Sequence, residues 1–365
     1  MTDTEQRPDS DAETTPVEQV FVVPDEGDGL RLDQCLATHL GGHSRAFYQK
    51  LIRQDDITLR GKACRRAETV HAGDEVRIRL TPAAPDVLVP QEVAFEILYE
   101  DDDILVINKP PGLVVHPAEG SRTGTLVHGL LFHDHESFAD MADDNQRPGI
   151  VHRLDKDTSG VMVVARNEES RRLLKASFKE REVEKTYLAL VMGEFGAVTG
   201  TIENEIGRNP RNRLKMAVVR EGGKHALTRY RVLGTSQGCS LLEVRIFTGR
   251  THQIRVHFSH LHHPILGDGL YGGDRADAPY RAERQLLHAW KLVFPHPRSG
   301  VMRQYMAPLP ADFAAALAAL GLPTMTAHPA ALETAAPALS TDRDIAPPHR
   351  PPPLDLPPDD PDTAS

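Results

Sequence analysis

Four short runs of aliphatic residues between positions 91 and 320 are separated by turn-forming residues and by one clear helical pattern. That pattern covers residues 168–182 and places Leu173, Leu174 and Phe178 on one face. A doubly wound parallel sheet needs a crossover helix between each strand and the next. Residues 91–320 show only one clear helical pattern among the four runs, which is too few helices for such a sheet. The order therefore predicts an α+β fold with a mixed, mainly antiparallel sheet. The four runs are 104–107, 161–164, 187–191 and 241–246.

Both ends of the chain differ in composition from its middle. Residues 1–28 are polar and acidic, and residues 321–365 hold eleven of the 28 prolines. Such segments bury too little apolar surface to offset the entropy lost on ordering, so we expect both to be disordered. The net charge of −10 is concentrated in these ends. The body of the chain is mildly basic, which permits a polyanionic partner.

Residues 29–82 have the pattern of a small separate domain, joined by a linker at 83–90 to a larger domain at 91–320. Two short helical patterns are followed by strand patterns at 57–59 and 73–80. Cations recur along the second helix and cluster in the next turn, and this favours RNA contact over an ordinary solvated surface. The candidate RNA-binding residues are Arg45, Lys50, Arg53, Arg60, Lys62, Arg65 and Arg66.

Several classes of protein are excluded by absent features. No run of 18 or more apolar residues occurs, and the N-terminus lacks the basic and then apolar order of a secretory signal. The three cysteines, Cys35, Cys64 and Cys239, are far apart and odd in number, which argues against a disulfide framework or a structural zinc site. We therefore expect a cytoplasmic protein with no membrane partner.

Three segments place polar residues beside the predicted strands, at 108–117, 149–160 and 248–257. In the second, Asp155 follows the apolar Leu154, which indicates a segment partly tucked against the core. A carboxylate there needs a cation partner to remain ionised. The third segment supplies two candidates, Arg250 and Arg255. A metal site at His260, His262 and His263 is disfavoured because no carboxylate-paired ligand spacing occurs.

The motifs His152-Arg153-Leu154-Asp155, Asn108-Lys109-Pro110 and Gly249-Arg250-Thr251-His252-Gln253 together resemble the RluA family of pseudouridine synthases. Residues 29–82 are similar to an S4 RNA-binding domain. The resemblance covers about 29–320. It implies a catalytic domain with a central RNA cleft behind a small α/β S4-like domain. It also implies isomerisation of uridine to pseudouridine in RNA with no metal and no organic cofactor.

The resemblance also implies roles for individual residues. Asp155 is expected to be the catalytic aspartate, Arg250 its ion-pair partner, and Tyr187 the aromatic residue against the uracil ring. Arg153 is expected to help displace the target base. Whether Asp155 attacks C1′, attacks C6 or acts as a base stays open. The expected substrate-binding residues are Arg153, His152, Lys109 and Arg255.

The arrangement of domains most resembles synthases that act on 23S rRNA of the large subunit, and we expect a monomer that binds this RNA or its precursor. Three alternatives remain. The first is a synthase acting on tRNA or at another rRNA site, which would have the same catalytic residues. The second is a non-catalytic RNA-binding factor of ribosome assembly, and the third is a histidine-dependent metal hydrolase.

Overall fold

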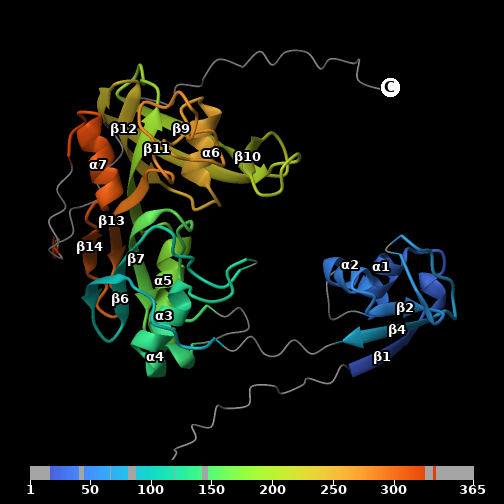
Figure 1. Cartoon of the computed structure of the whole chain (residues 1–365). Coiled ribbons are helices and arrows are strands. Elements are labelled where there is room, and N and C mark those ends of the chain that lie inside the picture. The colour runs from blue at the N-terminus through green and yellow to red at the C-terminus, as the bar shows by residue number, and fades with distance from the viewer. Residues whose placement is uncertain are drawn as a thin grey trace, which may run out of the picture. The chain divides into compact units, whose positions relative to one another are not determined.

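The computed structural model describes residues 17–40, 45–65, 67–80, 88–118, 120–141, 147–324 and 332–333. The chain divides into two compact units, Met1–Val87 and Leu88–Ser365 (Figure 1). The predicted linker at 83–90 spans this division, and its residues 83–87 lie outside the described part. We call the two parts the N-terminal unit and the C-terminal unit.

The N-terminal unit consists, in its described residues, of an antiparallel sheet in the order β1-β4-β2-β3 with short helices packed on it. Leu32, Leu36 and Tyr48 from the helical segments meet Ile57 and Ile78 from the sheet in one buried cluster. The elements are β1 (Val17–Val22), η1 (Asp25–Gly27), α1 (Leu32–Cys35), η2 (Leu36–Leu40), α2 (Arg45–Arg53), β2 (Ile57–Leu59), β3 (Lys62–Ala63) and β4 (Glu75–Leu80).

Strand β1 corrects the prediction that residues 1–28 are disordered. Val17–Val22 pairs antiparallel with β4 along its whole length, and the N-terminal unit therefore begins before residue 29. The side chains of Val17, Val20 and Val22 remain more than half exposed. Backbone pairing holds this strand along its length, and Phe21 packs against the core of the unit. Because most of its other apolar side chains stay exposed, the apolar content of the segment did not reveal the strand.

The C-terminal unit is built on a sheet of eleven described strands, and its main path runs β10-β9-β11-β12-β8-β13-β7-β6-β5. Among the described pairs, β13 with β7 is parallel and the rest are antiparallel, which confirms the predicted α+β class with a mainly antiparallel sheet. The strands are β5 (Glu96–Glu100), β6 (Ile104–Lys109), β7 (Ser159–Ala165), β8 (Glu184–Met192), β9 (Thr199–Arg208), β10 (Met216–Val219), β11 (Lys224–Ser236), β12 (Cys239–Ile246), β13 (Leu287–Pro295), β14 (Met302–Met306) and β15 (Leu332–Glu333).

Helices cover both faces of this sheet (Figure 1). Alternate residues of β8 point to opposite faces, as the two-residue period of a strand requires. Leu188 and Leu190 pack with α7, whereas Ala189 and Val191 share a cluster with Phe258 of α6. A strand buried on both faces reads as a continuous apolar run, which explains the run at 187–191. The helices are α3 (Leu126–His133), α4 (His135–Ala139), α5 (Glu168–Lys179), α6 (Gln253–His260) and α7 (Ala311–Ala319).

The beginning of the predicted disordered tail at 321–365 also differs from expectation. Leu322 is buried in the cluster that includes Phe313 and Leu317 of α7. Leu332–Glu333 forms β15, whose backbone pairs with β14. The remaining predicted tail residues, 325–331 and 334–365, lie outside the described part.

Two expectations from composition can be compared with the structure. The three cysteines are buried and free. None of the helices that the structure describes has the length and apolar character needed to traverse a bilayer.

Gly160 at the start of β7 occupies a position that a side chain cannot enter. Its φ is +120°, and a Cβ there would lie 2.1 Å from the carbonyl oxygen of Ala289 on β13. We expect Gly160→Ala to lower the free energy of unfolding by about 3 kcal/mol or more, because the parallel β7–β13 pair must separate. Urea denaturation followed by the fluorescence of Trp290 would measure the loss.

Gly238 provides the control for this experiment. Its φ is +71°, but a Cβ would meet no atom within 4 Å. Gly238→Ala therefore introduces backbone strain without a clash and should cost only about 1 kcal/mol. Equal losses in the two variants would show that the contact with Ala289 is not what requires glycine at position 160.

Candidate active site

Asp155 lies in the turn that leads into β7, and the rest of the turn holds it in place. The carbonyl oxygen of Asp155 accepts a hydrogen bond from the Thr158 amide at 3.1 Å. The buried ammonium of Lys109, at the end of β6, donates to the carbonyl oxygen of Lys156 at 2.8 Å. The carboxyl side chain itself is 22% exposed. The turn thus presents a partly accessible carboxylate from a fixed backbone.

The ion-pair partner of Asp155 is Arg255 of α6. Arg255 Nη1 donates to Asp155 Oδ2 at 3.0 Å. The same guanidinium donates through Nε and Nη2 to the two carboxyl oxygens of Asp268, at 2.7 and 2.9 Å. Burial alone would lower the pKa of Arg255, but Asp268 and Asp155 raise it above its ordinary value. A permanently charged arginine therefore links the accessible carboxylate to a fully buried one.

Tyr271 supports this arginine from the side. The Arg255 guanidinium lies over the Tyr271 ring, 5.0 Å from the ring centroid. The Tyr271 hydroxyl is 2.8 Å from His252 Nδ1. Burial lowers the pKa of His252, although the nearby Asp155 opposes the shift. A neutral imidazole at neutral pH therefore lies on one side of the carboxylate, 4.0 Å from its Oδ2.

Tyr187 of β8 completes a pocket beside Asp155. The pocket has a volume of about 110 Å³, and its lining includes Asp155, Tyr187, Arg250 and Arg255. This is several times the space of about 10–15 Å³ that one water molecule needs. A more open hollow of about 490 Å³ is also lined by Asp155 and Arg255. Burial and the charge of Asp155 raise the pKa of the Tyr187 hydroxyl well above its usual range, so the ring stays neutral.

The structure corrects the predicted role of Arg250. Its side chain lines the pocket, but its Nε donates to the carbonyl oxygen of His225 at 2.9 Å, and Asp155 pairs with Arg255. The reason is the backbone between the two arginines. His252 adopts a left-handed conformation with φ of +56°, and α6 begins immediately after it. Arg255, expected to bind substrate, is carried to Asp155 by the first turn of a helix that was not predicted.

Two other predicted substrate-binding residues have structural contacts instead. Lys109 is fully buried, and its Nζ donates to the carbonyl oxygens of Pro110, Leu113 and Lys156. Burial lowers the pKa of Lys109 to about 7. His152 Nε2 accepts a hydrogen bond from the Val163 amide, and its ring stacks on Phe178 with centroids 4.7 Å apart. Neither side chain lines the pocket beside Asp155.

Arg153, which was expected to help displace the target base, lines both hollows beside Asp155. It is exposed at the mouth of both hollows and forms no ion pair with a residue that the structure describes.

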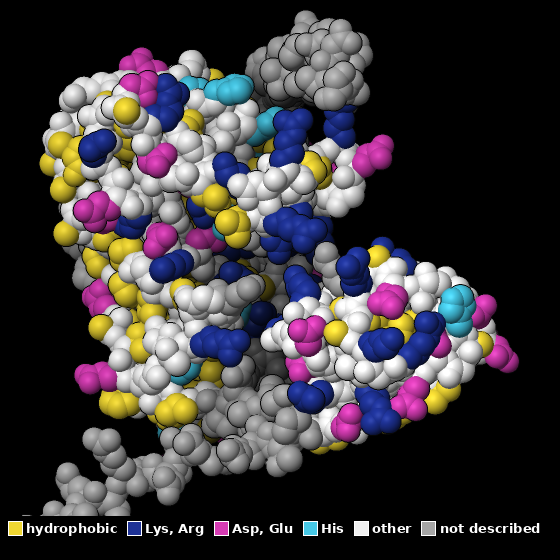
Figure 2. All heavy atoms as spheres, turned by 45° about the vertical axis from the view of Figure 1, so that its right-hand side comes forward, with side chains coloured by type: hydrophobic (Ala, Val, Ile, Leu, Met, Phe, Trp, Pro, Cys, Tyr) yellow, Lys and Arg dark blue, Asp and Glu magenta, His cyan; other side chains and the backbone are white. Residues whose placement is uncertain are grey.

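The candidate RNA-binding residues of the N-terminal unit fall into two groups. Arg45 pairs with the buried Asp33 at 3.0 Å, and Arg60 Nε donates to Asp74 at 2.6 Å, so both are already engaged within the unit. The others that the structure describes are exposed, on a surface where cations and acids are mixed (Figure 2). They are Lys50, Arg53, Lys62 and Arg65, whereas Arg66 lies outside the described residues.

The pairing of Asp33 with Arg45 predicts an acid-sensitive N-terminal unit. Burial raises the pKa of the Asp33 carboxyl, but hydrogen bonds from Arg45, Arg31 and Gln49 outweigh it and hold the pKa at about 2. The folded state therefore binds the proton less tightly than the unfolded state does. The stabilisation of the folded N-terminal unit by the ionised Asp33 carboxylate should be complete above about pH 4. It should be lost as the pH falls towards 2.

Asp33→Asn tests this expectation. Hydrogen exchange of the amides of α1 and α2 should show lower protection in the variant at pH 6, with the difference shrinking between pH 4 and pH 2. A difference that stays constant with pH would contradict the assignment of the effect to the Asp33 charge.

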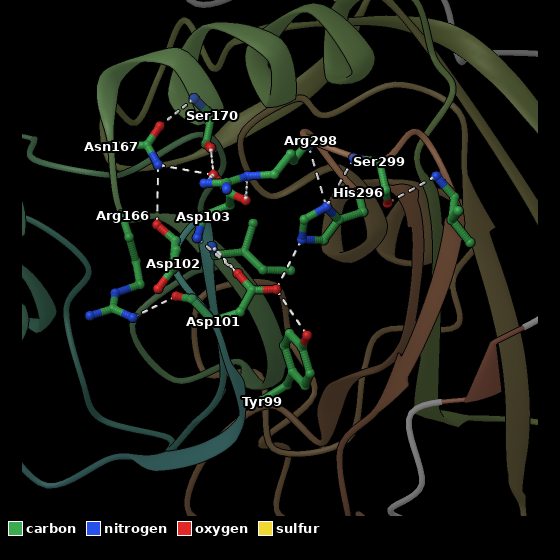
Figure 3. Close-up of polar contacts among 12 residues, drawn as sticks. Tyr99, Asp101, Asp102, Asp103, Arg166, Asn167, Ser170, His296, Arg298 and Ser299 are labelled. Atoms are coloured by element: carbon green, nitrogen blue, oxygen red, sulfur yellow. Dashed lines mark hydrogen bonds and ion pairs between the residues drawn. The ribbon is translucent and has the colours of Figure 1, made fainter.

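Carboxylate and imidazole donors converge elsewhere, at the β5–β6 turn. Asp101, Asp103 and His296 form the one group of three potential metal ligands among the described residues (Figure 3). Their atoms are already engaged: Asp101 accepts from Tyr99 and His296, and Asp103 pairs with Arg298 at 2.6 Å. The group joins two turns as a hydrogen-bond network. His260, His262 and His263, the alternative metal site, form no such group in the described residues.

Asp268 and Tyr271 are the site residues that sequence reasoning missed. Asp268 is fully buried, and its carboxylate also accepts from the amides of Leu270 and Tyr271. The available signal was Gly267-Asp268-Gly269, an acid between two glycines 13 residues after Arg255. Glycine at 267 is required, because its φ is +80° and a Cβ would lie 2.0 Å from the Arg284 carbonyl oxygen.

Residues 103–260 match the family model described as RNA pseudouridylate synthase. The chain is 43% identical over 309 residues to a protein of Xanthomonas campestris pv. campestris named ribosomal large subunit pseudouridine synthase D, covering 82% of this chain and 91% of that one. A protein of the same name from Neisseria meningitidis is 42% identical, covering 83% of this chain and 82% of the relative.

Among solved structures, human RNA pseudouridylate synthase domain containing 1 is 32% identical, covering 59% of this chain and 83% of that chain, with a TM-score of 0.49. The family match includes Asp155 and Arg255, and the relatives extend over most of the chain. The chain therefore belongs to the RluA family of RNA pseudouridine synthases.

Proposed function

We propose that this pseudouridine synthase isomerises uridines in large-subunit rRNA, with Asp155 as the catalytic carboxylate. The observation that carries the proposal is the partly exposed Asp155 carboxylate, paired with Arg255 beside the Tyr187 ring. The rRNA substrate is supported by relatives named ribosomal large subunit pseudouridine synthase D that cover more than four fifths of this chain.

The proposed reaction needs a carboxylate and no oxidant. The C1′–N1 bond breaks, uracil turns, and a C1′–C5 bond forms. The C5 proton is then lost and N1, which carries no proton in uridine, gains one, so atoms and electrons balance within the nucleoside. Asp155 supplies an oxygen pair that can attack the nucleoside or accept a proton. We propose that neither a metal nor an organic cofactor takes part, because the isomerisation has no net redox change.

Arg255 and Asp268 hold that carboxylate in its reactive state. A guanidinium 3.0 Å away stabilises the negative charge of Asp155, and a charge-assisted hydrogen bond fixes its direction. Asp268 holds the guanidinium by two parallel bonds, so Arg255 cannot turn away when Asp155 engages the substrate. Asp268 is in these terms a positioning residue.

Arg153 and Tyr187 act on the base. A uridine inside a helix must leave its stack to reach the pocket, at a cost of about a few kcal/mol. The exposed Arg153 guanidinium can occupy the vacated position, and the Tyr187 ring offers an apolar face to the uracil. We therefore propose that Arg153 stabilises the flipped state and that Tyr187 orients the base.

The direct test of the substrate is a map of pseudouridines in cells that lack this protein. Specific pseudouridines of the large-subunit rRNA should disappear, and the wild-type gene should restore them. Loss of pseudouridines only from tRNA or another rRNA would support the alternative synthase. An unchanged map together with a defect in ribosome assembly would support a non-catalytic RNA-binding factor and overturn the proposal.

We propose that the N-terminal unit is an S4-like RNA-binding domain. Its exposed Lys50, Arg53, Lys62 and Arg65 support this, and its contacts define a compact unit of its own. Deletion of residues 1–87 should weaken binding to long rRNA while the remaining chain still converts a short stem-loop. If a folded truncation converted neither RNA, the unit would instead be required to build the active site.

A further inference from the structure

His252 lies in the active site but has no role in the reaction as described so far. It lines both hollows beside Asp155, and 19% of its side chain is exposed. Its backbone is left-handed, with φ of +56° and ψ of +20°, at the residue that precedes α6. A residue other than glycine adopts this conformation infrequently, and such residues concentrate at functional sites. The surrounding structure therefore holds His252 at the pocket against a local preference of the backbone.

The hydrogen bonds of Tyr271 determine which ring nitrogen of His252 carries the hydrogen. The Tyr271 hydroxyl oxygen accepts from the Met216 amide at 2.9 Å. The hydroxyl hydrogen then remains for His252 Nδ1, 2.8 Å away, which is the other partner of this hydroxyl among the described residues. Burial lowers the pKa of His252, so the ring is neutral at neutral pH. A neutral imidazole that accepts at Nδ1 carries its hydrogen on Nε2.

The Nε2–H group of His252 has no acceptor in the part of the chain that the structure describes. Asp155 Oδ2 lies 4.0 Å from Nε2, which is too far for a hydrogen bond. Arg255 of the same pocket already uses Nε, Nη1 and Nη2 on Asp268 and Asp155. His252 therefore offers the pocket an unused neutral donor beside the carboxylate.

The isomerisation creates an acceptor that such a donor can stabilise. When the C1′–N1 bond breaks, the uracil ring takes up negative charge, which its two carbonyl oxygens share. O2 is bonded to the carbon next to N1 and so lies beside the bond that breaks. A half turn of the ring about the axis through N3 and C6 exchanges N1 with C5 and also O2 with O4. One fixed donor can therefore bind O2 before the turn and O4 after it.

We propose that His252 is a further catalytic residue, whose Nε2–H group donates to uracil O2 as the C1′–N1 bond breaks and to O4 after the ring has turned. The inference rests on the proposed function. Because the donor is neutral, it stabilises the developing charge without forming the ion pair with Asp155 that a second cation would form. The hydrogen stays on Nε2 throughout, so the balance of atoms in the isomerisation is unchanged.

Two amide replacements in the full-length chain test whether the donor at Nε2 accelerates the reaction. His252→Asn should lower the single-turnover rate at saturating enzyme by about 10²-fold or more, the loss expected when one donor to a developing oxyanion is removed. Asparagine tolerates the left-handed conformation and can accept from Tyr271, but its amide ends short of the position of Nε2. His252→Gln extends a neutral N–H group further and should recover at least about tenfold of the lost rate. A histidine needed only for its backbone conformation and its bond to Tyr271 would give the opposite order and overturn the proposal.

The matched control is His262→Asn. His262 is a second histidine in the left-handed conformation, with φ of +64°, but it is exposed and lines neither hollow. Its variant should react at close to the wild-type rate. All three variants should bind RNA within about twofold of the wild-type affinity, because the contact gains its strength as charge develops. An equal loss of rate in the control, or a wild-type rate for His252→Asn, would overturn the proposal.

The contact with O2 is tested with RNA that carries 2-thiouridine at the position that the wild type converts. Sulfur is a weak hydrogen-bond acceptor. The ratio of the rate on uridine RNA to the rate on 2-thiouridine RNA should be at least about fivefold larger for the wild type than for His252→Asn. Any effect of sulfur on the nucleoside itself is common to both proteins and cancels in this comparison.

Equal ratios in the two proteins would show that His252 does not contact O2 and would overturn the inference alone. An effect of sulfur that lies wholly in the affinity of the wild type would also overturn it, because a steric contact, and not a hydrogen bond to developing charge, acts in that way. A wild-type chain that makes no pseudouridine from uridine in any RNA would instead overturn the proposed function, and the inference with it.

Discussion

Asp155→Asn is expected to reduce the rate of pseudouridine formation by about 10⁴-fold or more, because no other group described in the pocket replaces the carboxylate as nucleophile or base. RNA affinity should change little. Folding should also survive, because Arg255 keeps both of its bonds to Asp268 when Asp155 becomes neutral. Release of tritium from C5-labelled uridine in RNA measures the rate.

The matched control is Asp277→Asn, which removes the same charge from a side chain that is 65% exposed and paired with Arg275. The rate for this variant should stay near that of the wild type. Unchanged tritium release from Asp155→Asn protein would remove the basis for the proposed catalytic role. A collapse of its melting temperature would show that Asp155 is needed for folding.

Asp268→Asn is expected to give the largest loss of stability. It leaves the buried Arg255 guanidinium with the partly exposed Asp155 as its remaining charged partner, and breaking a buried ion pair by removing one charge costs about 3–5 kcal/mol. Activity should fall as well, because the guanidinium loses the contact that fixes its direction toward Asp155. Urea denaturation monitored by Trp290, together with single-turnover kinetics of whatever protein remains folded, measures both effects.

The double variant Arg255→Met/Asp268→Leu separates the two effects. Replacing both charges by apolar groups should recover much of the stability, since no unpaired charge remains at the buried positions 255 and 268. Activity should stay low, because Asp155 then has no guanidinium beside it. Recovery of activity along with stability would show that Arg255 does not support the carboxylate.

The sequence predicted which segments meet but not which side chains face one another. The turn with Asp155, the strand with Tyr187 and the segment 248–257 do line one pocket. Within the last segment the choice between Arg250 and Arg255 depended on where α6 begins. The helix begins after His252, whose left-handed backbone conformation is not indicated by any periodicity in the sequence. Gln253 then anchors the first turn of α6 through hydrogen bonds to Leu227 and Thr228.

The errors over Lys109 and His152 have a different physical origin. Residue type shows that a side chain can bind an anion, whereas its direction depends on contacts made across the fold. Lys109 turns inward because three carbonyl oxygens converge on its ammonium, two of them in its own turn and one 47 residues away. His152 turns toward β7 and Phe178. Such convergence is a property of tertiary structure and leaves no local pattern.

Because Lys109 is fully buried, its chemical reactivity can report on the opening of the turn that carries Asp155. Its amine has no exposed surface, so an amine-directed acylating reagent reaches it only when the turn that carries Asp155 opens. The rate at which Lys109 becomes labelled, read by mass spectrometry, would therefore time the opening of that turn in the intact enzyme. RNA that closes over the turn should slow this labelling.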